Sequence, residues 1–287
     1  MKLGLSSYSL YQEIQAGKMT ILDALQWSAE NGAEHMEIVP FGFSLVDQPD
    51  VVDAIVNKAK EVGIELSNYS IGANFIQPSE EAYELEIARV MREVDIANAL
   101  GVKLMRHDVA SRPMEETSVT NYYTDLPRLI EACQRIADHA STYGITTSVE
   151  NHGYYIQHSD RVQALVQGVN RENFRTTLDV GNFMCADENS VAAVKNNLPI
   201  ASVIHLKDFY LRPANQFPGE GWFPTLSGNY LRGAIVGQGD IDMWEVISVI
   251  KKSGYDGYIS IEFEGLEPCT FGSKAGLDNA RRIWNAV

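Results

Sequence analysis

The 287 residues of this chain are 45% hydrophobic and 21% charged, which is the composition of a folded globular protein long enough to form one large domain. Its 38 acidic residues outnumber 23 basic ones and give a net charge of −15, which argues against a nucleic-acid partner because such binding needs a Lys/Arg surface. No apolar run approaches the roughly 18 residues of a membrane span, and the N-terminus has no signal-peptide pattern, so we expect a cytoplasmic protein without a membrane partner. Three separated cysteines without a C-x-x-C pair indicate neither a disulfide framework nor a thiolate zinc site.

Strand-like and helix-like patterns alternate along the whole chain. We expect strands at residues 3–7, 35–39, 64–69, 102–106, 146–151, 175–180, 201–207 and 258–263. We expect helices at residues 20–31, 49–62, 79–100, 121–143, 159–167, 190–197, 243–251 and 274–287. Several of these helices are followed by glycine just before the next strand, as at Gly63 and Gly101, because glycine readily adopts the left-handed conformation that ends a helix.

Eight strand-then-helix units predict an α/β protein with one (β/α)8 TIM-barrel domain over residues 1–287. The alternative, a doubly wound open sheet, would more usually show a G-x-G-x-x-G turn after an early strand, and the sequence has none. One connection, from about residue 208 to 242, is unusually long and contains prolines, glycines and the aromatic Trp222. Long connections in compact domains are often lids or binding loops, so we expect part of the substrate pocket there.

Four polar residues lie where the last four predicted strands end: Glu150, Asp179, His205 and Glu262. The carboxyl ends of barrel strands meet at one mouth, where TIM-barrel enzymes hold their active sites. A lone strand-end carboxylate is most often a loop cap or an ion-pair partner, and a lone histidine is most often structural. Three carboxylates crowded at one mouth, however, would repel one another unless a cation neutralised them.

The donor set indicates the kind of ion and of chemistry. Three carboxylates and an imidazole, with no thiolate, predict one divalent metal ion, Mn²⁺ or Mg²⁺ in the first place and Co²⁺ or Zn²⁺ as alternatives. The hydroxyl and carbonyl groups of a sugar would bind such an open site as a bidentate ligand. The ion would then polarise the carbonyl while a proton leaves the neighbouring carbon.

The motifs around these residues, V-E-N-H at 149–152, L-D-V-G-N at 178–182, I-H-L-K-D at 204–208 and S-I-E at 260–262, resemble the xylose isomerase-like TIM-barrel superfamily. The nearest branch is the sugar phosphate isomerase/epimerase group, which is similar to ketose 3-epimerases, inosose dehydratases and hydroxypyruvate isomerases. G-Q-G-D-I-D at 237–242 also resembles this group, and the likeness covers essentially the whole chain.

The resemblance implies that Glu150 and Glu262 are both ligands and the catalytic acid/base pair, whereas Asp179 and His205 are ligands only. It also implies a small-molecule sugar or keto-sugar as the partner. Members of this group are often dimers or tetramers, so a homo-oligomer is one expected form.

Further residues are candidates for substrate binding, each with a structural alternative. Lys207 faces the same way as His205 and would hold a substrate oxyanion or form a surface ion pair. His152 would contact substrate or orient a ligand. Glu37 and Arg106 resemble pocket-lining positions but would also suit a structural ion pair, and Arg232 would anchor a hydroxyl or phosphate or remain a solvated loop residue. Trp222 belongs to the expected pocket loop. Glu264 rivals Glu262, which we prefer because S-I-E matches the family motif.

Four functions follow in order of preference. The first is a divalent-metal-dependent sugar or sugar phosphate isomerase/epimerase, and the second is a dehydratase (lyase) that uses the same site. The third is a sugar-binding barrel without catalysis. The fourth is a nuclease similar to endonuclease IV, which uses additional histidines for a trinuclear zinc cluster. One of those positions is Asn182 here, and with the acidic charge this argues against DNA repair.

Overall fold

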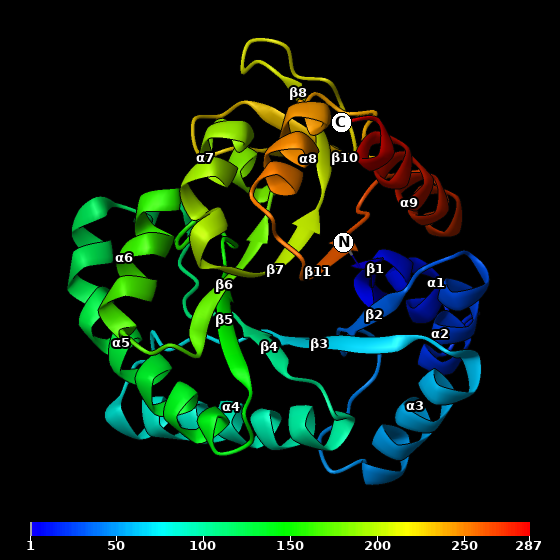
Figure 1. The fold of residues 1–287 in the computed structure, drawn as a ribbon. Helices are drawn as coiled ribbons and strands as arrows, with labels where there is room; N and C mark the ends of the chain where they lie inside the picture. Colours follow the sequence, from blue (N-terminus) through cyan, green and yellow to red (C-terminus); the bar gives the residue numbers. More distant parts are fainter. Residues whose placement is uncertain (1) are drawn as a thin grey trace.

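The computed structural model describes residues 2–287, so Met1, the first residue of the expected domain, lies outside the described part. Eight parallel strands close into a barrel in the order β1-β11-β7-β6-β5-β4-β3-β2 (Figure 1). Their bounds are β1 Lys2–Ser6, β2 His35–Ile38, β3 Glu65–Ile71, β4 Leu104–His107, β5 Thr146–Glu150, β6 Phe174–Asp179, β7 Ala201–Leu206 and β11 Tyr258–Ile261. The predicted single-domain TIM barrel is confirmed.

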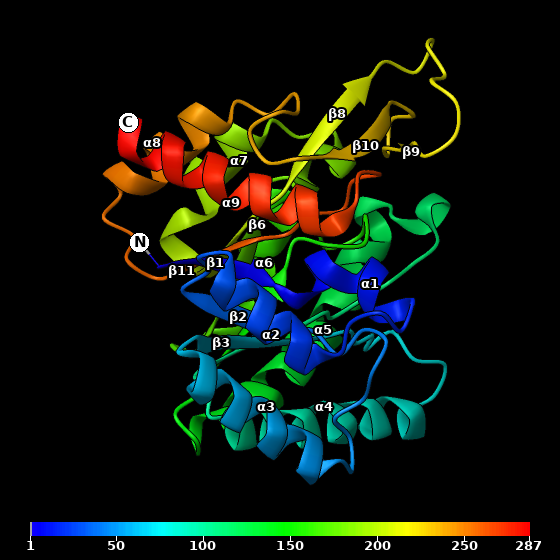
Figure 2. The same cartoon turned by 90° about the vertical axis from the view of Figure 1, so that its right-hand side faces the viewer.

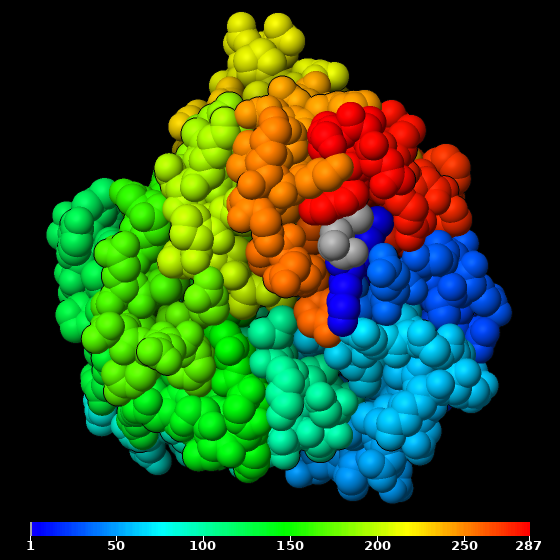
Figure 3. All heavy atoms as spheres, in the orientation of Figure 1, coloured from blue at the N-terminus to red at the C-terminus, as the bar shows by residue number. Residues whose placement is uncertain are grey.

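Helices surround this barrel, and in Figure 3 the colours follow one another around the molecule in the order of the sequence. Their bounds are α1 Tyr11–Gln15, α2 Ile21–Glu30, α3 Pro49–Val62, α4 Glu80–Leu100, α5 Val119–Ser141, α6 Ser159–Val169, α7 Ser190–Asn197, α8 Met243–Lys252 and α9 Cys269–Ala286. None of the helices within residues 2–287 combines the length and the apolar character that crossing a bilayer requires.

Helix α9 begins five residues before the predicted start at Lys274. Its first turns contain Gly272 and Gly276. Because glycine is a poor helix former, the sequence pattern did not indicate a helix in these turns. Packing overrides this preference, because a Cβ at Gly272 would lie 2.4 Å from the ring of Phe263. Glycine therefore lets the helix approach the end of β11 closely.

The long connection after β7, which we expected to be a loop that forms part of the substrate pocket, contains regular structure. It folds into a three-stranded antiparallel sheet of β8 (Asp208–Arg212), β10 (Tyr230–Ala234) and β9 (Phe223–Pro224), with β10 in the middle. This sheet projects from the body of the barrel (Figure 2). The strands are only two to five residues long and are interrupted by prolines and glycines, so they leave little period-2 pattern to recognise.

Alternation along the barrel strands places the polar residues of the site. Apolar residues such as Val149, Ile204 and Ile261 face the helices and are fully buried. Their neighbours face the barrel axis, where Ser148 Oγ and Thr177 Oγ1 lie 2.8 Å apart. Polar side chains at the strand ends therefore project into the mouth rather than toward the helices.

Candidate metal centre

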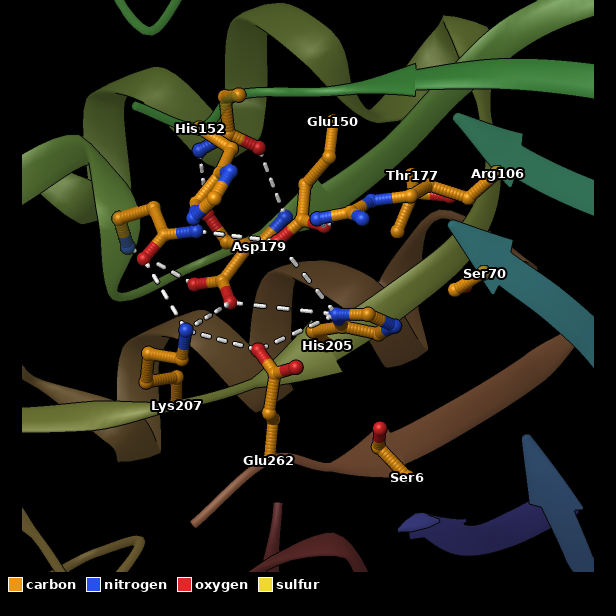
Figure 4. Close-up of polar contacts among 12 residues, drawn as sticks. Ser6, Ser70, Arg106, Glu150, His152, Thr177, Asp179, His205, Lys207 and Glu262 are labelled. Carbon is orange, nitrogen blue, oxygen red and sulfur yellow. Dashed lines mark hydrogen bonds and ion pairs between the residues drawn. The ribbon is translucent and has the colours of Figure 1, made fainter. Parts of the chain in front are cut away.

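The structure brings together the four residues predicted as metal ligands (Figure 4). One ligand atom from each lies within 4.8 Å of the others, and all four side chains are buried: Glu150, Asp179, His205 and Glu262. The first three end or nearly end their strands, and Glu262 follows β11. Parallel register aligns them, since Asp179 pairs with His205 and Ser260 pairs with His205 from the other side.

Three atoms of this cluster are buried without a hydrogen bond: Asp179 Oδ2, His205 Nδ1 and Glu262 Oε2. Buried polar atoms are nearly always satisfied, because an unsatisfied one costs about 1–3 kcal/mol. Here the three orphaned atoms point at a common centre. Two carboxylate oxygens and an imidazole nitrogen arranged in this way fit a divalent cation.

Neighbouring groups orient two of the ligands. His205 Nε2 lies 2.8 Å from Glu37 Oε2, so a proton on Nε2 leaves the lone pair of Nδ1 for the cluster. Asp179 Oδ1 accepts hydrogen bonds from the backbone N–H groups of Gly181 (2.7 Å) and Asn182 (2.8 Å), which directs Oδ2 inward. Burial raises the pKa of Asp179 to about 7; the nearby carboxylates add to this rise and Lys207 opposes it, so a bound cation would favour the ionised form.

The two glutamates differ in how they are held. Arg106 Nε donates to Glu150 Oε2 at 2.6 Å, and Asn182 Nδ2 donates to Glu150 Oε1 at 3.0 Å. Burial would raise the pKa of Glu150, but Arg106 and His205 lower it to about 2. Burial would also raise the pKa of Glu262, and Lys207 and His205 hold it well below its usual value. Both carboxylates are therefore ionised.

Lys207 forms ion pairs with two of the ligands. Its Nζ lies 2.8 Å from Glu262 Oε2 and 3.3 Å from Asp179 Oδ2, which are two of the three orphaned atoms. Burial alone would lower the pKa of Lys207, but the surrounding carboxylates raise it well above its usual value. Lys207 therefore partly neutralises the cluster and competes with a metal ion for the same oxygens.

The cluster opens into a cavity of about 450 Å³ at the mouth of the barrel. Four residues predicted to bind substrate line it, namely Glu37, Arg106, His152 and Lys207, whereas the other two do not. Arg232 and Trp222 lie together on the antiparallel sheet, with the guanidinium carbon 5.6 Å from the ring centroid.

The rival carboxylate Glu264 also lines the cavity but contributes no ligand atom to the cluster. It lies 3.5 Å from Lys207 Nζ and accepts a hydrogen bond from the hydroxyl of Tyr8 at 3.2 Å.

Among the lining residues that went unrecognised in the sequence are Asp108 and Tyr8. Asp108 follows β4 and lies 3.2 Å from His152 Nδ1 and 3.4 Å from Arg106. Its position directly after a strand was a usable signal. Tyr8 lies in the short 3-10 turn after β1, which no periodic pattern announces.

Comparison with known proteins agrees with this geometry. Residues 25–283 match the family model described as xylose isomerase-like TIM barrel. The chain belongs to this family. Among curated proteins it is 27% identical over 148 residues to an inosose dehydratase from Bacillus licheniformis, in a match that covers 50% of this chain and 49% of that protein. The chain thus matches about half the length of this curated relative.

Two solved structures share the whole fold. A D-psicose 3-epimerase with D-tagatose from Clostridium cellulolyticum H10 has a TM-score of 0.76 and 17% identity, covering 99% of both chains. A probable 3-DHS dehydratase from Bacillus anthracis also has a TM-score of 0.76, with 16% identity over 97% of this chain and 98% of the other. At such identities these likenesses establish the fold alone.

Proposed function

We propose that this protein is a divalent-metal-dependent sugar isomerase or epimerase that moves a proton at the carbon beside a carbonyl group. The observation that carries the proposal is the placement of Glu150 and Glu262 at the two sides of the ligand cluster (Figure 4). They come from the two ends of the arc β5-β6-β7-β11. A substrate held at the cluster would therefore have one carboxylate near each face.

Glu150, Asp179, His205 and Glu262 would hold the ion, with Mn²⁺ or Mg²⁺ best suited to the donor set. When bound, a divalent cation polarises a carbonyl group and stabilises negative charge on its oxygen. The burial of the ligands excludes water from that side of the reacting carbon, which strengthens these electrostatic interactions.

The proton transfers belong to the two glutamates. Glu262 Oε2 points at the cluster, and within residues 2–287 its Oε1 makes no hydrogen bond, so that oxygen can accept a proton from substrate. Both oxygens of Glu150 are already hydrogen-bonded, one of them to Arg106. We assign the first abstraction to Glu262 and the return of a proton on the opposite face to Glu150, whose ionised carboxylate first has to take up that proton from water. We expect this second transfer to be the slower one, because Arg106 and His205 lower the pKa of Glu150 and so reduce the fraction of it that carries a proton.

Dehydration is a second candidate, favoured by the curated relative and by His152. Elimination needs one base and one acid, and of the two glutamates assigned to proton transfer it is Glu262 that has an oxygen without a hydrogen bond. The Asp108 carboxylate raises the pKa of His152, so its imidazole keeps a proton to higher pH and could donate it to a leaving hydroxyl. Glu262 would take the proton beside the carbonyl, a carbon–carbon double bond would form, and the hydroxyl would leave as water.

Deuterium uptake tests both candidates. We expect the Mn²⁺-loaded protein to exchange the hydrogen beside the carbonyl of at least one member of a panel of ketoses and keto-sugars in D2O, as followed by mass spectrometry. Loss of water with a new ultraviolet absorbance from an enone would identify the dehydratase. Tight binding without exchange would identify a sugar-binding barrel, and no exchange with the entire panel would refute the proposal.

A pair of variants tests the base. Glu262→Gln should lower the exchange rate by about 10²–10⁴-fold, the usual contribution of a general base. Glu264→Gln is the matched control on the same segment and should lower it by about tenfold at most, since Glu264 contributes no ligand atom. Metal content has to be measured in both variants, because Glu262 is also a ligand. Equal losses at equal metal content would contradict the assignment.

A further inference from the structure

A second, smaller cavity of about 210 Å³ adjoins the metal cavity. We call it the side chamber. The two cavities share the side chains of His152, Lys207 and Glu264, so a ligand could extend from one into the other. The rest of the chamber wall includes Tyr154, Gln157, Asn182, Cys185, Phe209 and Phe223.

The metal cavity is poorly suited to an anionic substrate. Six carboxylates line it, against three Lys/Arg side chains, Arg89, Arg106 and Lys207. Each of these three cations is already within ion-pair distance of at least one carboxylate: Glu86 at 2.8 Å from Arg89, Asp108 at 3.4 Å from Arg106 and Glu262 at 2.8 Å from Lys207.

A divalent cation adds two positive charges, and the six lining carboxylates still outnumber the five charges of the ion and the three Lys/Arg side chains. Recognition of a phosphate or carboxylate group normally uses guanidinium or ammonium groups that are free to form charge-assisted hydrogen bonds. The lining residues within 2–287 offer no Lys/Arg side chain that is free of a carboxylate. The occupant of this cavity should therefore be uncharged.

The side chamber has a different character. Apart from the three shared residues, its wall contains no charged side chain, and three of its residues are aromatic. Phe209 and Phe223 meet edge to face with their ring centroids 5.6 Å apart. Such a wall suits a group with an apolar face, for example the C–H face of a second sugar ring or an aromatic substituent.

Tyr154 shows that this wall is built at some conformational cost. Its backbone has a φ of 65°, in the left-handed region that residues other than glycine rarely adopt. Its hydroxyl donates a hydrogen bond to the carbonyl oxygen of Pro224 at 2.9 Å, which links the loop after β5 to strand β9. Strained residues of this kind cluster at ligand sites, where the surrounding structure holds them in place.

We propose that the substrate is an uncharged glycoside, with its keto-sugar ring in the metal cavity and its second ring in the side chamber against Tyr154 and Phe223. The proposal rests on the function proposed for the metal site and narrows it to one class of substrate. A free monosaccharide would occupy the first cavity only, and a sugar phosphate would place its charge among carboxylates.

Calorimetric titration of the Mn²⁺-loaded protein tests this with three probes: a hexose whose keto group lies at a ring carbon other than the anomeric one, the phosphate ester of that sugar, and its phenyl glycoside, which keeps the keto group. We expect the glycoside to bind at least about tenfold more tightly than the free sugar, since burying an aromatic ring gains more than the 1.4 kcal/mol that tenfold requires. The phosphate should bind at least about tenfold more weakly. Phosphate binding as tight as that of the free sugar, or no preference for the glycoside, would overturn the proposal.

Variants locate the second ring. Phe223→Ala should remove the preference for the glycoside and leave the affinity for the free sugar within about twofold of the parent protein. Phe223→Leu keeps an apolar side chain and should therefore lose only part of the preference for the glycoside. Phe217→Ala is the matched control, because Phe217 is 71% exposed in the connection between β8 and β9 and lines neither cavity. A Phe223→Ala protein with an unchanged melting temperature that still prefers the glycoside would overturn the proposal.

Deuterium exchange with the same probes separates this inference from the proposed function. If the glycoside binds preferentially but no probe exchanges, the proposed function fails and the side chamber stands. If the free sugar exchanges while the glycoside is neither bound nor exchanged, the proposed function stands and the glycoside proposal fails.

Discussion

Replacement of Glu37 by glutamine tests whether the histidine ligand is held from across the barrel. Glu37 Oε2 lies 2.8 Å from His205 Nε2, and both side chains are almost completely buried. A hydrogen bond to a charged group is worth about 1.5–3 kcal/mol, against about 1 kcal/mol for a neutral one. Glutamine keeps the volume of the side chain and an acceptor oxygen. Glu37→Gln should therefore weaken the hydrogen bond to His205 only by the difference between a charged and a neutral hydrogen bond, about 1–2 kcal/mol. We therefore expect Mn²⁺ affinity to fall by about tenfold, within the 10–100-fold typical of residues that support a ligand.

Titration of metal-free protein with Mn²⁺, with free Mn²⁺ followed by electron paramagnetic resonance, measures this affinity without reference to catalysis. The matched control is Glu93→Gln. Glu93 is also buried and lines the same cavity, but it accepts a hydrogen bond from Tyr69 at 2.7 Å rather than from a ligand. Its variant should bind Mn²⁺ within about threefold of the parent protein, a difference below 1 kcal/mol. The reasoning is refuted if Glu37→Gln binds as tightly as the parent, or if both variants weaken equally.

Three other predictions follow from the same structure. Lys207→Met should tighten Mn²⁺ binding by at least about tenfold in the same titration, because the ammonium group no longer competes for two ligand oxygens; weaker binding would show that Lys207 assists the ion instead. Burial lowers the pKa of His107 to about 4, from 6.5 in the unfolded chain. The buried neutral imidazole therefore contributes fully to the free energy of unfolding above pH 6.5, and this contribution is lost as the pH falls toward 4. Urea unfolding of metal-free protein should therefore show that His107→Gln reduces the drop in unfolding free energy between pH 7 and pH 5 by about 2 kcal/mol, and parallel pH profiles would contradict this. Gly239→Ala should destabilise the protein by about 1–3 kcal/mol or more in thermal unfolding, because a Cβ there would lie 2.2 Å from Asp208 Oδ1 and 2.6 Å from the carbonyl oxygen of Phe209; an unchanged melting temperature would be incompatible with that packing.

The barrel and its ligands could be predicted because both depend on local patterns. Each of the strands that carry ligands is short, and the polar residue comes at or just after its end, as with Glu150 and Asp179. Parallel strands in a closed barrel bring their carboxyl ends to the same mouth, so ligands that lie 26 to 57 positions apart in the chain become neighbours by topology alone. No side-chain detail is needed for that inference.

The remainder of the site depends on packing that sequence patterns do not encode. The connection after β7 was predicted as a pocket loop, yet it folds into a small sheet in which Arg232 lies over the rings of Trp222 and Tyr210, beside neither cavity. The sheet contributes instead through Phe209 and Phe223, which line the side chamber. Strand β9 has only two residues, and its antiparallel register with β10 decides which of its faces points inward. This register is a property of the tertiary structure.

The two halves of the barrel supply different parts of the centre, and this explains which residues were recognised. Strands β5, β6 and β7 and the end of β11 supply the four ligands. Glu37 of β2 holds His205 from across the barrel. Arg106 of β4 holds Glu150 from the neighbouring strand (Figure 4). Glu37 in turn is held by Asn68 of β3 at 3.1 Å and by Ser6 of β1 at 3.4 Å. Partners that meet across the barrel axis, such as residues 37 and 205, are 168 positions apart, and no spacing rule relates them. A strand-end glutamate in the first half of such a barrel is therefore better interpreted as a residue that orients a ligand than as a substrate contact, and the glutamine variant at position 37 distinguishes these roles, because only the first changes metal affinity in the absence of substrate.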